Sequence, residues 1–518
     1  MTARLEVDTF ISKPLVGMAE GPYPNVLRPL GEFAVSPGSL TRIWIDTYVP
    51  GGTAAGEYSS LITVRRRGED LAQVPVRLRV LPLDIPAAPS QPAVVGLNYG
   101  LVASYYGREE GSAAYRKLMD SFYWFLIKRR MSPLQPPVAI DSPELAAYMN
   151  DERVSACRLP ISPANPRFRR AVAVADEGGW LNKLFAYFID EPTYHQYKDI
   201  VGAGRMIHSM PARPKFLVTC FPEEPLIGAV DIWCIHLHFL PEGIPHGLMD
   251  RERYYEAVKG RMEAGDEVWW YTAGAVRPFP TLQIEDDPAA FRIIPWLQQM
   301  YRIGGFLHWE TANWNQPFEE PFVKFFGNGE GVLLYPGDMQ PDPSIRLELL
   351  REGLEDMEHL VLLRKRIEGL QETLGAERLG DAASVRVGEL CRRLIDEEAL
   401  RASASNGLFL MRHFVREPGR IEQAREEVVE ETIDLANRPY ALVLTEPEEK
   451  QYTESADARI YGVVERGCRV EINGRKATVD KAGNFSARLP LSSGSNVFEV
   501  RLKKRKHVKV ILRKIERF

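Results

Sequence analysis

The 518-residue chain lacks the features that define several common classes of protein. No run of about 20 apolar residues occurs, so the sequence predicts no membrane-spanning helix. The formal charge of -5 argues against nucleic acid or an anionic membrane as the main partner. The five cysteines form no CxxC pair and predict no disulfide framework; they are Cys157, Cys220, Cys234, Cys391 and Cys468.

The remaining composition is typical of a large globular protein. Hydrophobic residues make up 45% and charged residues 26%, and the length predicts about two to four domains. Aromatic residues reach 10%, which suits a sugar-binding cleft because flat rings cover the apolar faces of pyranose rings. The segment that starts at Met1 has no apolar signal-peptide core, so the sequence as it stands predicts a cytoplasmic protein. A leader upstream of this start would make the protein extracellular.

Changes of pattern along the chain predict four parts. Residues 1–85 contain alternating strand-like runs and predict a β-sandwich piece, short for a complete sandwich. Residues 86–340 alternate between short apolar runs and amphipathic helices. Residues 341–438 are helical, with Leu350, Leu354 and Met357 at helical spacing. Residues 439–518 return to strands, and an Asn473-Gly474 turn indicates a hairpin in a small Ig-like module.

The second part predicts an α/β fold with a (β/α)8 barrel. Runs that are apolar on both faces, each followed by a helix, indicate a parallel sheet buried on both sides. Eight such runs fit a closed barrel better than an open doubly wound sheet, and no glycine-rich phosphate loop follows the first run. The predicted strands are 94–99, 131–138, 154–158, 184–190, 216–220, 231–236, 267–271 and 305–309, and the predicted helices are 113–127, 167–175, 194–209, 251–264 and 288–302.

A pair of acids follows the fourth predicted strand. Barrels of this kind carry their functional residues at the C-terminal ends of the strands, where Asp190 and Glu191 are expected to lie. Burying two neighbouring carboxylates is costly unless they are solvated or hydrogen-bonded, so the pair predicts a catalytic role. The structural alternative is an N-cap and a first-turn acid for the helix that begins near Tyr194.

Paired carboxylates are typical of glycoside hydrolysis, but they usually lie on opposite sides of the scissile bond. Two adjacent residues cannot easily straddle a sugar in this way. The seventh predicted strand ends without an acid, and on the eighth Glu310 is the one convenient second carboxylate. A substrate-assisted route needs no such residue. The carbonyl oxygen of a 2-acetamido group attacks C1, while Glu191 acts as general acid/base and Asp190 orients the acetamido N–H.

Four motifs resemble glycoside hydrolase family 123 and the related DUF4091 proteins. They are Phe188-Ile-Asp-Glu-Pro, Gly304-Gly-Phe-Leu-His-Trp-Glu-Thr-Ala-Asn-Trp, Gly329-Glu-Gly-Val-Leu-Leu-Tyr-Pro-Gly and the run from Pro343 to Leu360. The resemblance spans residues 41–363. It implies a β-N-acetylgalactosaminidase with a β-sandwich, a barrel and substrate-assisted catalysis, in which the family's catalytic Asp-Glu pair corresponds to Asp190 and Glu191. The short N-terminal β region departs from the family pattern, and the Ig-like module is an addition to it.

Other strand ends supply candidates for the substrate cleft. This mechanism requires a tyrosine that donates to the acetamido oxygen, and Tyr271 is the predicted donor. His236 and His238 could instead bind a metal, but no third ligand is evident, so we expect neither metal nor cofactor. We expect a glycan or glycoconjugate as the binding partner. The predicted substrate-binding residues are Asn98, Tyr99, His236, Trp270, Tyr271, Trp309, Glu310, Asn313 and Trp314. For each aromatic residue among them, packing in the hydrophobic core is an equal alternative.

The sequence also leaves several alternatives open. A sugar without an acetamido group would need Glu191 as acid/base and Glu310 as nucleophile. A non-catalytic carbohydrate-binding barrel is a third possibility, although binding alone does not require the Asp190-Glu191 pair. The basic run at residues 503–509 could bind an anionic polymer or protect a strand edge from pairing. The charged residues at 346–358 could form a solvated or an ion-paired face.

Overall fold

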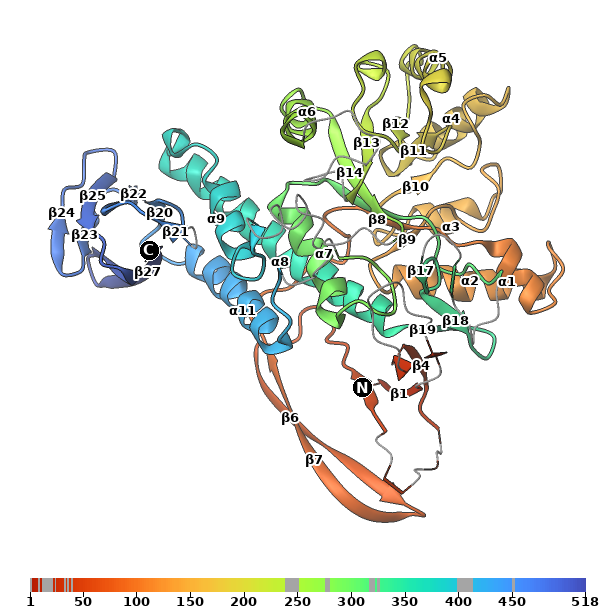
Figure 1. Cartoon of the computed structure of the whole chain (residues 1–518), viewed down its shortest axis with the longest axis horizontal. Coiled ribbons are helices and arrows are strands. Elements are labelled where there is room, and N and C mark those ends of the chain that lie inside the picture. Colours follow the sequence, from red (N-terminus) through yellow and green to blue (C-terminus); the bar gives the residue numbers. More distant parts are fainter. Residues whose placement is uncertain are drawn as a thin grey trace.

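Figure 1 shows a barrel surrounded by helices, a helical segment beside it, and a separate β module at the C-terminal end of the chain. This computed structural model describes residues 2–7, 10–11, 22–23, 25–31, 34, 37–38, 41–237, 251–274, 280–315, 322–323, 327–397, 413–449 and 452–518.

Eight parallel strands form the central sheet, in the order β10-β11-β12-β13-β14-β15-β8-β9. Each predicted run supplies one strand, so the predicted barrel is confirmed. Most strands are shorter than predicted, because their C-terminal residues leave the ladder to form the loops of one barrel face. The strands are β8 (Ala93–Val95), β9 (Ser132–Pro133), β10 (Cys157–Arg158), β11 (Leu184–Tyr187), β12 (Lys215–Val218), β13 (Ile232–His236), β14 (Glu267–Thr272) and β15 (Gly305–His308).

The barrel has one seam without a regular ladder, between β9 and β10. Single hydrogen bonds bridge this seam. The backbone N–H of Arg158 donates to the carbonyl oxygen of Leu134 at 2.7 Å. The backbone N–H of Ser155 donates to Oγ of Ser132 at 3.0 Å. The sheet is therefore nearly closed, and its C-terminal strand ends surround one pocket.

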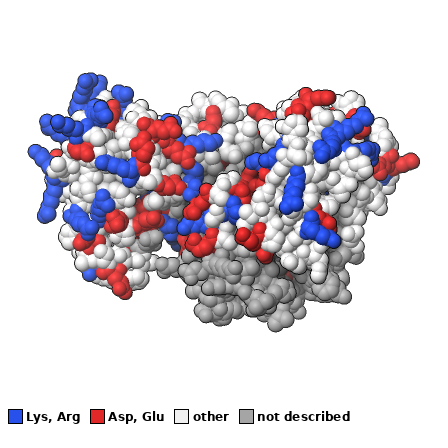
Figure 2. All heavy atoms as spheres, turned by 90° about the horizontal axis from the view of Figure 1, so that it is seen from above, with Lys and Arg blue, Asp and Glu red and all other residues white. Residues whose placement is uncertain are grey.

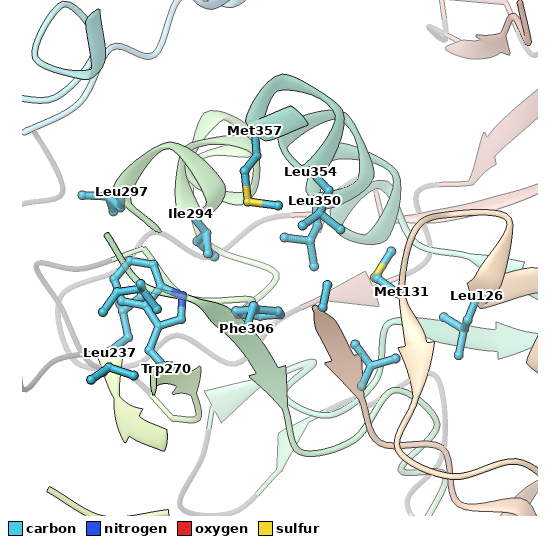
Figure 3. Packing of buried hydrophobic residues seen from close by; sticks show 14 of the residues in the cluster. Leu126, Met131, Leu237, Trp270, Ile294, Leu297, Phe306, Leu350, Leu354 and Met357 are labelled. Atoms are coloured by element: carbon cyan, nitrogen blue, oxygen red, sulfur yellow. The ribbon is translucent and has the colours of Figure 1, made fainter. Parts of the chain in front are cut away.

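Side chains alternate between the barrel interior and the helix layer outside it. On β14, Trp269 and Tyr271 belong to the interior cluster, whereas Trp270 belongs to the cluster between the sheet and the helices. Figure 3 shows Trp270 and Phe306 on the side of the sheet that faces the helices, whose residues include Ile294 and Met357. This alternation decides which residues of a strand can reach the pocket.

Helices cover the outside of the sheet; all five predicted ones form, and two short helices, at 99–105 and 145–149, were not predicted. Ser112 caps α2 by accepting a hydrogen bond from the N–H of Tyr115 at 3.1 Å. Pro288 occupies the first turn of α7, directly after the Asp287 cap. The barrel helices are α1 (Tyr99–Tyr105), α2 (Ala113–Ile127), α3 (Leu145–Met149), α4 (Phe168–Glu177), α5 (Tyr197–His208), α6 (Arg251–Glu263) and α7 (Pro288–Met300).

The helical segment after the barrel contains α8 (Ile345–Leu374), α9 (Ala382–Cys391) and α11 (Pro418–Leu435). Ser344 caps α8, and Gly375 ends it in the left-handed conformation that favours glycine. The charged residues of α8 are ion-paired rather than solvated. Glu348 pairs with Arg129, which follows α2, at 2.8 Å, and Asp356 pairs with Arg292 of α7 at 2.7 Å. These pairs fasten α8 to the barrel helices.

The C-terminal module has its own hydrophobic core between two sheets of order β20-β22-β25 and β21-β27-β26-β23-β24. Its strands are β20 (Ala441–Glu446), β21 (Tyr452–Thr453), β22 (Asp457–Val464), β23 (Arg469–Ile472), β24 (Arg475–Ala477), β25 (Asn484–Pro490), β26 (Gly494–Lys504) and β27 (His507–Arg517). In Figure 1, α11 leads from the helical segment into the module.

The N-terminal region forms small sheets, of which β6 and β7 make a long hairpin that projects from the molecule (Figure 1). Asn25 links this region to α8, since its carbonyl oxygen accepts from the N–H of Ile345 at 2.7 Å. Within the described residues, the structure has no helix whose length and hydropathy would let it span a membrane. The strands outside the barrel and the C-terminal module are β1 (Thr2–Val7), β2 (Phe10–Ile11), β3 (Pro22–Tyr23), β4 (Val26–Pro29), β5 (Ile43–Asp46), β6 (Gly56–Arg66), β7 (Glu69–Val80), β16 (Phe322–Val323), β17 (Gly327–Asn328), β18 (Leu334–Pro336) and β19 (Pro341–Pro343).

Candidate active site

A pocket of about 690 Å³ opens at the C-terminal ends of the barrel strands. This size lies in the range of roughly 300–1,000 Å³ that is typical of small-molecule sites. Asp190 and Glu191 lie on its wall, on the loop after β11, and both are exposed to solvent. The other lining residues come from neighbouring strand ends and loops: Leu134, Arg158, Leu159, Pro160, Ile161, Ser162, Tyr187, Phe188, Thr219, Tyr271, Ala273, Leu307 and Trp309.

Two hydroxyl groups hold the carboxylate of Asp190. Tyr187, the last residue of β11, donates to Oδ1 of Asp190. Thr219, directly after β12, donates to the same oxygen at 2.8 Å. No described residue donates a hydrogen bond to Oδ2 of Asp190, so this oxygen is available to a donor on a ligand.

Glu191 has a strained backbone, with φ at +43°. A non-glycine residue in this region costs of order 1–3 kcal/mol and persists where its surroundings fix it. Here the backbone N–H of Glu191 donates to Oγ1 of Thr219 at 2.8 Å. Its side chain accepts a hydrogen bond at Oε1 from the hydroxyl of Tyr271, at 2.5 Å. The two adjacent carboxylates therefore have different partners. Thr219 hydrogen-bonds to both residues, through the side chain of Asp190 and the backbone of Glu191.

The helix after the pair has its own cap. Thr193 and Gln196 form a capping box at the short 3-10 turn η2 (Tyr194–Gln196), with the N–H of Thr193 donating to Oε1 of Gln196 at 2.8 Å. The structural alternative, in which Asp190 or Glu191 caps this helix, is therefore wrong.

Burial keeps the two tyrosines of the site protonated. Burial, and the charges of Asp190 and Glu191, raise the pKa values of Tyr187 and Tyr271 well above the usual range. Both phenols are hydrogen-bond donors at any ordinary pH. Behind Tyr271, burial lowers the pKa of His236 to about 4, so this imidazole is neutral at pH 7. Its ring lies edge-on to Tyr271, with the ring centres 4.7 Å apart.

Trp309 is held in the pocket wall by the loop Gly329-Glu330-Gly331. Its indole Nε1 donates to Oε1 of Glu330 at 3.0 Å. A Cβ atom at Gly331, whose φ is +71°, would lie 2.5 Å from the indole ring. Burial raises the pKa of the Glu330 carboxyl to about 8, so the group is largely protonated at neutral pH. The glycine gives the ring room, and the buried acid fixes its orientation.

The structure corrects the prediction for three aromatic residues. Tyr99, Trp270 and Trp314 are buried in the hydrophobic core and do not line the pocket. Trp270 faces the helices because its neighbours Trp269 and Tyr271 take the interior positions of β14. Trp314 packs edge-on against Phe122, with the ring centres 5.6 Å apart. Core packing accounts for all three.

Glu310 and the two asparagines also lie away from the pocket lining. Oε1 of Glu310 accepts hydrogen bonds from the backbone N–H groups of Asn98, Thr311 and Ala312, at 3.2, 2.8 and 2.9 Å. The side chain of Asn98 caps α1, and that of Asn313 accepts a hydrogen bond from Asn315 at 2.7 Å. Glu310 is buried and fixes the loop after β15, so the structure does not present it as a nucleophile.

Of the predicted substrate-binding residues, Tyr271 and Trp309 line the pocket and His236 supports Tyr271. Nε2 of His236 lies 2.9 Å from the carbonyl oxygen of Ala273. His238 lies outside the described residues. Within the described part of the chain, no group of three or more His, Cys, Asp or Glu side chains could hold a metal ion.

Sequence reasoning missed Arg158, Tyr187 and Thr219, which all line the pocket. Each stands at or directly after the end of a barrel strand, so the rule that located Asp190 could have found them. Glu330 had no such signal, since it lies on a later loop and reaches the pocket only through Trp309.

Comparison with known proteins supports this assignment of the fold. Residues 226–363 match the family model described as glycoside hydrolase 123, catalytic domain, and residues 440–511 match glucodextranase, domain B. No curated protein sequence matches the chain significantly.

One solved structure shares the fold over most of the chain. It is a family 123 glycoside hydrolase from Clostridium perfringens, reported for glycolipid glycan hydrolysis, with 15% identity and a TM-score of 0.58 over 84% of this chain and 86% of that one. An FMN-binding beta-glucuronidase from Facaelibacterium prausnitzii L2-6 has 8% identity and a TM-score of 0.28, over 89% of this chain and 62% of that one. A beta-glucuronidase from Parabacteroides merdae has 9% identity and a TM-score of 0.29, over 100% and 59%. The last two scores are too low to carry an argument.

The family-model match over residues 226–363, together with the acid pair at the active face of the barrel, supports a glycosidase. The match of residues 226–363 to the family 123 catalytic-domain model confirms the resemblance that the motifs predicted. A glycan is therefore the class of substrate.

Proposed function

We propose that the chain is a retaining, exo-acting β-N-acetylhexosaminidase that uses the 2-acetamido group of its substrate as the nucleophile. The choice of N-acetylgalactosamine as the sugar rests on the resemblance to family 123. The observation that carries the mechanism is the adjacent pair Asp190 and Glu191, in one pocket but with separate hydrogen-bond partners.

In the first step the acetamido carbonyl oxygen attacks C1 and the bond from C1 to the leaving oxygen breaks. Glu191 gives its proton to the leaving oxygen, and Asp190 accepts the acetamido N–H at Oδ2. The product is an oxazolinium ion. In the second step Glu191 takes a proton from water, the water oxygen attacks C1, and the ring opens with the configuration retained.

The neighbours of the pair suit these roles. The hydroxyls of Tyr187 and Thr219 fix Asp190 so that one oxygen remains for the substrate. Tyr271 is a buried donor within reach of Glu191, and we assign it to the acetamido oxygen during attack. Trp309 offers a flat surface to the sugar ring. Among the described residues that line the pocket, Asp190 and Glu191 are the only carboxylates, which disfavours an ordinary double displacement.

The test is hydrolysis of p-nitrophenyl β-N-acetylgalactosaminide beside its N-acetylglucosamine, galactose and glucose analogues. We expect release from 2-acetamido substrates alone, with inhibition by a thiazoline mimic of the oxazolinium ion. Asp190→Asn and Tyr271→Phe should lower kcat by about 10²–10⁴-fold. Glu191→Gln should do so most strongly on a disaccharide, because p-nitrophenolate leaves without a proton.

Two controls complete this experiment. Glu177→Gln removes an exposed acid at the end of α4 and should leave the rates unchanged. Release from plain hexosides by Asp190→Asn would refute substrate assistance, and loss of that activity in Glu310→Gln at wild-type stability would restore Glu310 as the nucleophile.

A further inference from the structure

The C-terminal module differs in charge from the rest of the protein. Residues 439–518 hold 17 Lys and Arg against 10 Asp and Glu, so the module carries +7, and the remaining chain carries -12 because the total is -5. In Figure 2 the blue Lys and Arg side chains gather at the left end of the molecule, where Figure 1 places this module. Such an asymmetry is an electrostatic signal for an anionic partner of the module.

Five exposed cations form a cluster at one end of the five-stranded sheet, which we call the basic tip: Arg466, Arg469, Lys503, Arg505 and Lys506. Arg469 on β23 lies directly opposite Lys503 on β26. None of the five forms an ion pair with another described residue. Two neighbouring acids pair with other cations, Glu465 with Lys504 and Glu499 with Arg501, both at 2.8 Å, and Glu471 of β23 lies opposite Arg501.

Two features of the basic tip weaken the fold, and no ion pair with a described residue offsets them. Like charges directly opposite each other on antiparallel strands are destabilising, as Arg469 and Lys503 are here. The turn from β26 to β27 places Arg505 at a φ of +54°, where asparagine or glycine is preferred. The equivalent turn from β23 to β24 has the favourable pair Asn473-Gly474. Both features are explained if the cations serve a ligand.

Protection of a strand edge does not explain them. The cations stand at the turn and at the ends of the strands. In the half of β27 next to the turn, Val508, Val510 and Leu512 are apolar and exposed. A strand protected against edge pairing carries its charges along its length.

A second observation points to the same ligand chemistry. Arg158, at the end of β10, lines the pocket that holds Asp190 and Glu191. Its guanidinium donates to Oε1 of Gln135 at 2.8 Å and forms no ion pair with a described carboxylate. Burial lowers the pKa of this guanidinium, because the charged group is partly desolvated. Its charge is not balanced by a described carboxylate. An acidic substituent on the sugar would supply an anion.

We propose that the basic tip binds an acidic polysaccharide, one with sulfate or carboxylate groups on successive sugars, and holds this polymer near the barrel. That the polymer is a glycan rests on the proposed function, and that it is anionic rests on the tip. Arginine and lysine bind sulfate and carboxylate through charge-assisted hydrogen bonds. A polymer held by the module raises the effective concentration of its chain ends at the pocket.

The test uses the full chain and measures binding to chondroitin sulfate, hyaluronan and neutral dextran by calorimetry. The tip variant replaces four cations with glutamine, at Arg469, Lys503, Arg505 and Lys506. The control variant removes the same charge from exposed, unpaired cations elsewhere, at Arg66, Arg67, Arg77 and Arg366. We expect the wild type and the control to bind the two acidic polymers and not dextran, more weakly as salt increases. The tip variant should bind at least about tenfold more weakly.

The readouts separate this inference from the proposed function. Hydrolysis of p-nitrophenyl β-N-acetylgalactosaminide should be equal in all three proteins, and the tip variant should unfold at the same or a higher temperature than the wild type. Polymer binding without hydrolysis would overturn the proposed function and keep the tip as a polyanion site. Equal binding by the tip and control variants would overturn the inference. So would binding to phosphatidylserine vesicles in the absence of binding to either acidic polymer.

Discussion

At the scale of single residues, the pocket depends on buried polar groups that make few but specific contacts. Thr219 ties the two acids together, Tyr271 stays protonated beside Glu191, and Glu330 orients Trp309 from behind. The carboxyl of Glu330 is fully buried, and one of its oxygens has no hydrogen-bond partner in the described structure. Burying a protonated, neutral carboxyl in such an environment costs much less free energy than burying a charged carboxylate.

The pH dependence of stability should reveal this proton. Folding raises the pKa of Glu330 from its ordinary 4.5 to about 8, so between these values the folded state holds a proton that the unfolded state releases. The stabilisation by Glu330 is therefore complete below about pH 4.5 and is lost as the pH rises through about 8, by about 1.4 kcal/mol per pH unit in between. Glu330→Gln keeps the acceptor for Trp309 and removes the titration.

Thermal unfolding of both proteins at pH 5, 7 and 9 measures the difference. Relative to the variant, the wild type should lose stability with each step up in pH. Parallel curves for the two proteins would contradict the assignment of a protonated Glu330.

At the scale of elements, α8 connects the helix layer to the loops of the active face. Arg346, in its first turn, is fully buried and donates to the carbonyl oxygens of Leu282, Gly329 and Val332. These carbonyls belong to the loops after β14 and β15, so the helix helps to place Glu330. Further along, α8 approaches α7 closely at Gly353.

Substitution of Gly353 should separate the two helices. A Cβ atom there would lie 2.5 Å from the carbonyl oxygen of Arg292 and 3.0 Å from the ring of Pro295. We expect Gly353→Ala to destabilise the protein by about 1–3 kcal/mol, despite the better helix propensity of alanine. Urea unfolding measures the change.

The same helix supplies a matched control. At Gly369 a Cβ atom would meet no atom within 4 Å, so Gly369→Ala should stabilise by roughly 0.5–1 kcal/mol. A gain of equal size in both variants would show that the helices do not need the glycine.

At the scale of the whole molecule, a buried charge network joins the helical segment to the C-terminal module. Arg386 of α9 pairs with Glu389 at 2.6 Å, with Glu431 of α11 at 2.8 Å, and with Glu449, which follows β20. Lys509 of β27 donates to the carbonyl oxygens of Asp434 and Asn437, at 2.8 and 2.6 Å. The module is thereby held against the helical segment.

Arg386→Met should loosen the module while the barrel stays intact. Three carboxylates, of which Glu389 and Glu449 are buried, would lose their shared cation, which costs about 3–5 kcal/mol. Calorimetry should show the module unfolding at least about 10 °C earlier, with hydrolysis by the barrel unchanged below that transition. Arg488→Met is the control, because its pair with Asp457 is exposed and contributes about 0–1 kcal/mol. Unfolding in one unchanged transition would contradict a role for the network.

The same charge network should lose its stabilising effect at low pH. Burial alone would raise the pKa of Glu431, but the charges of Arg386 and Arg513 outweigh it and lower the value to about 2. A lowered folded-state pKa stabilises above the ordinary value of 4.5, and this stabilisation is lost as the pH falls from 4.5 through about 2. In the wild type, the module transition should therefore move down in this pH window before that of the barrel does.

The sequence by itself determined the barrel, the segments that supply its strands and the position of the acid pair. Apolar periodicity is a local property, and the rule that parallel strands point their C-terminal ends to one face needs no side-chain contacts. It therefore placed Asp190 and Glu191 correctly on the loop after the fourth strand.

Only the tertiary structure decided which neighbours of the pair reach the pocket. A strand that is buried on both faces carries no mark of which residues point inward, so both Trp270 and Tyr271 were predicted to bind substrate. The barrel turned Trp270 to the helices and Tyr271 to Glu191. Contacts between distant segments were equally invisible, as for Glu310 with three backbone N–H groups and Glu330 with Trp309. Such pairings arise when the chain closes on itself, because the partners are set by three-dimensional packing and not by spacing along the sequence.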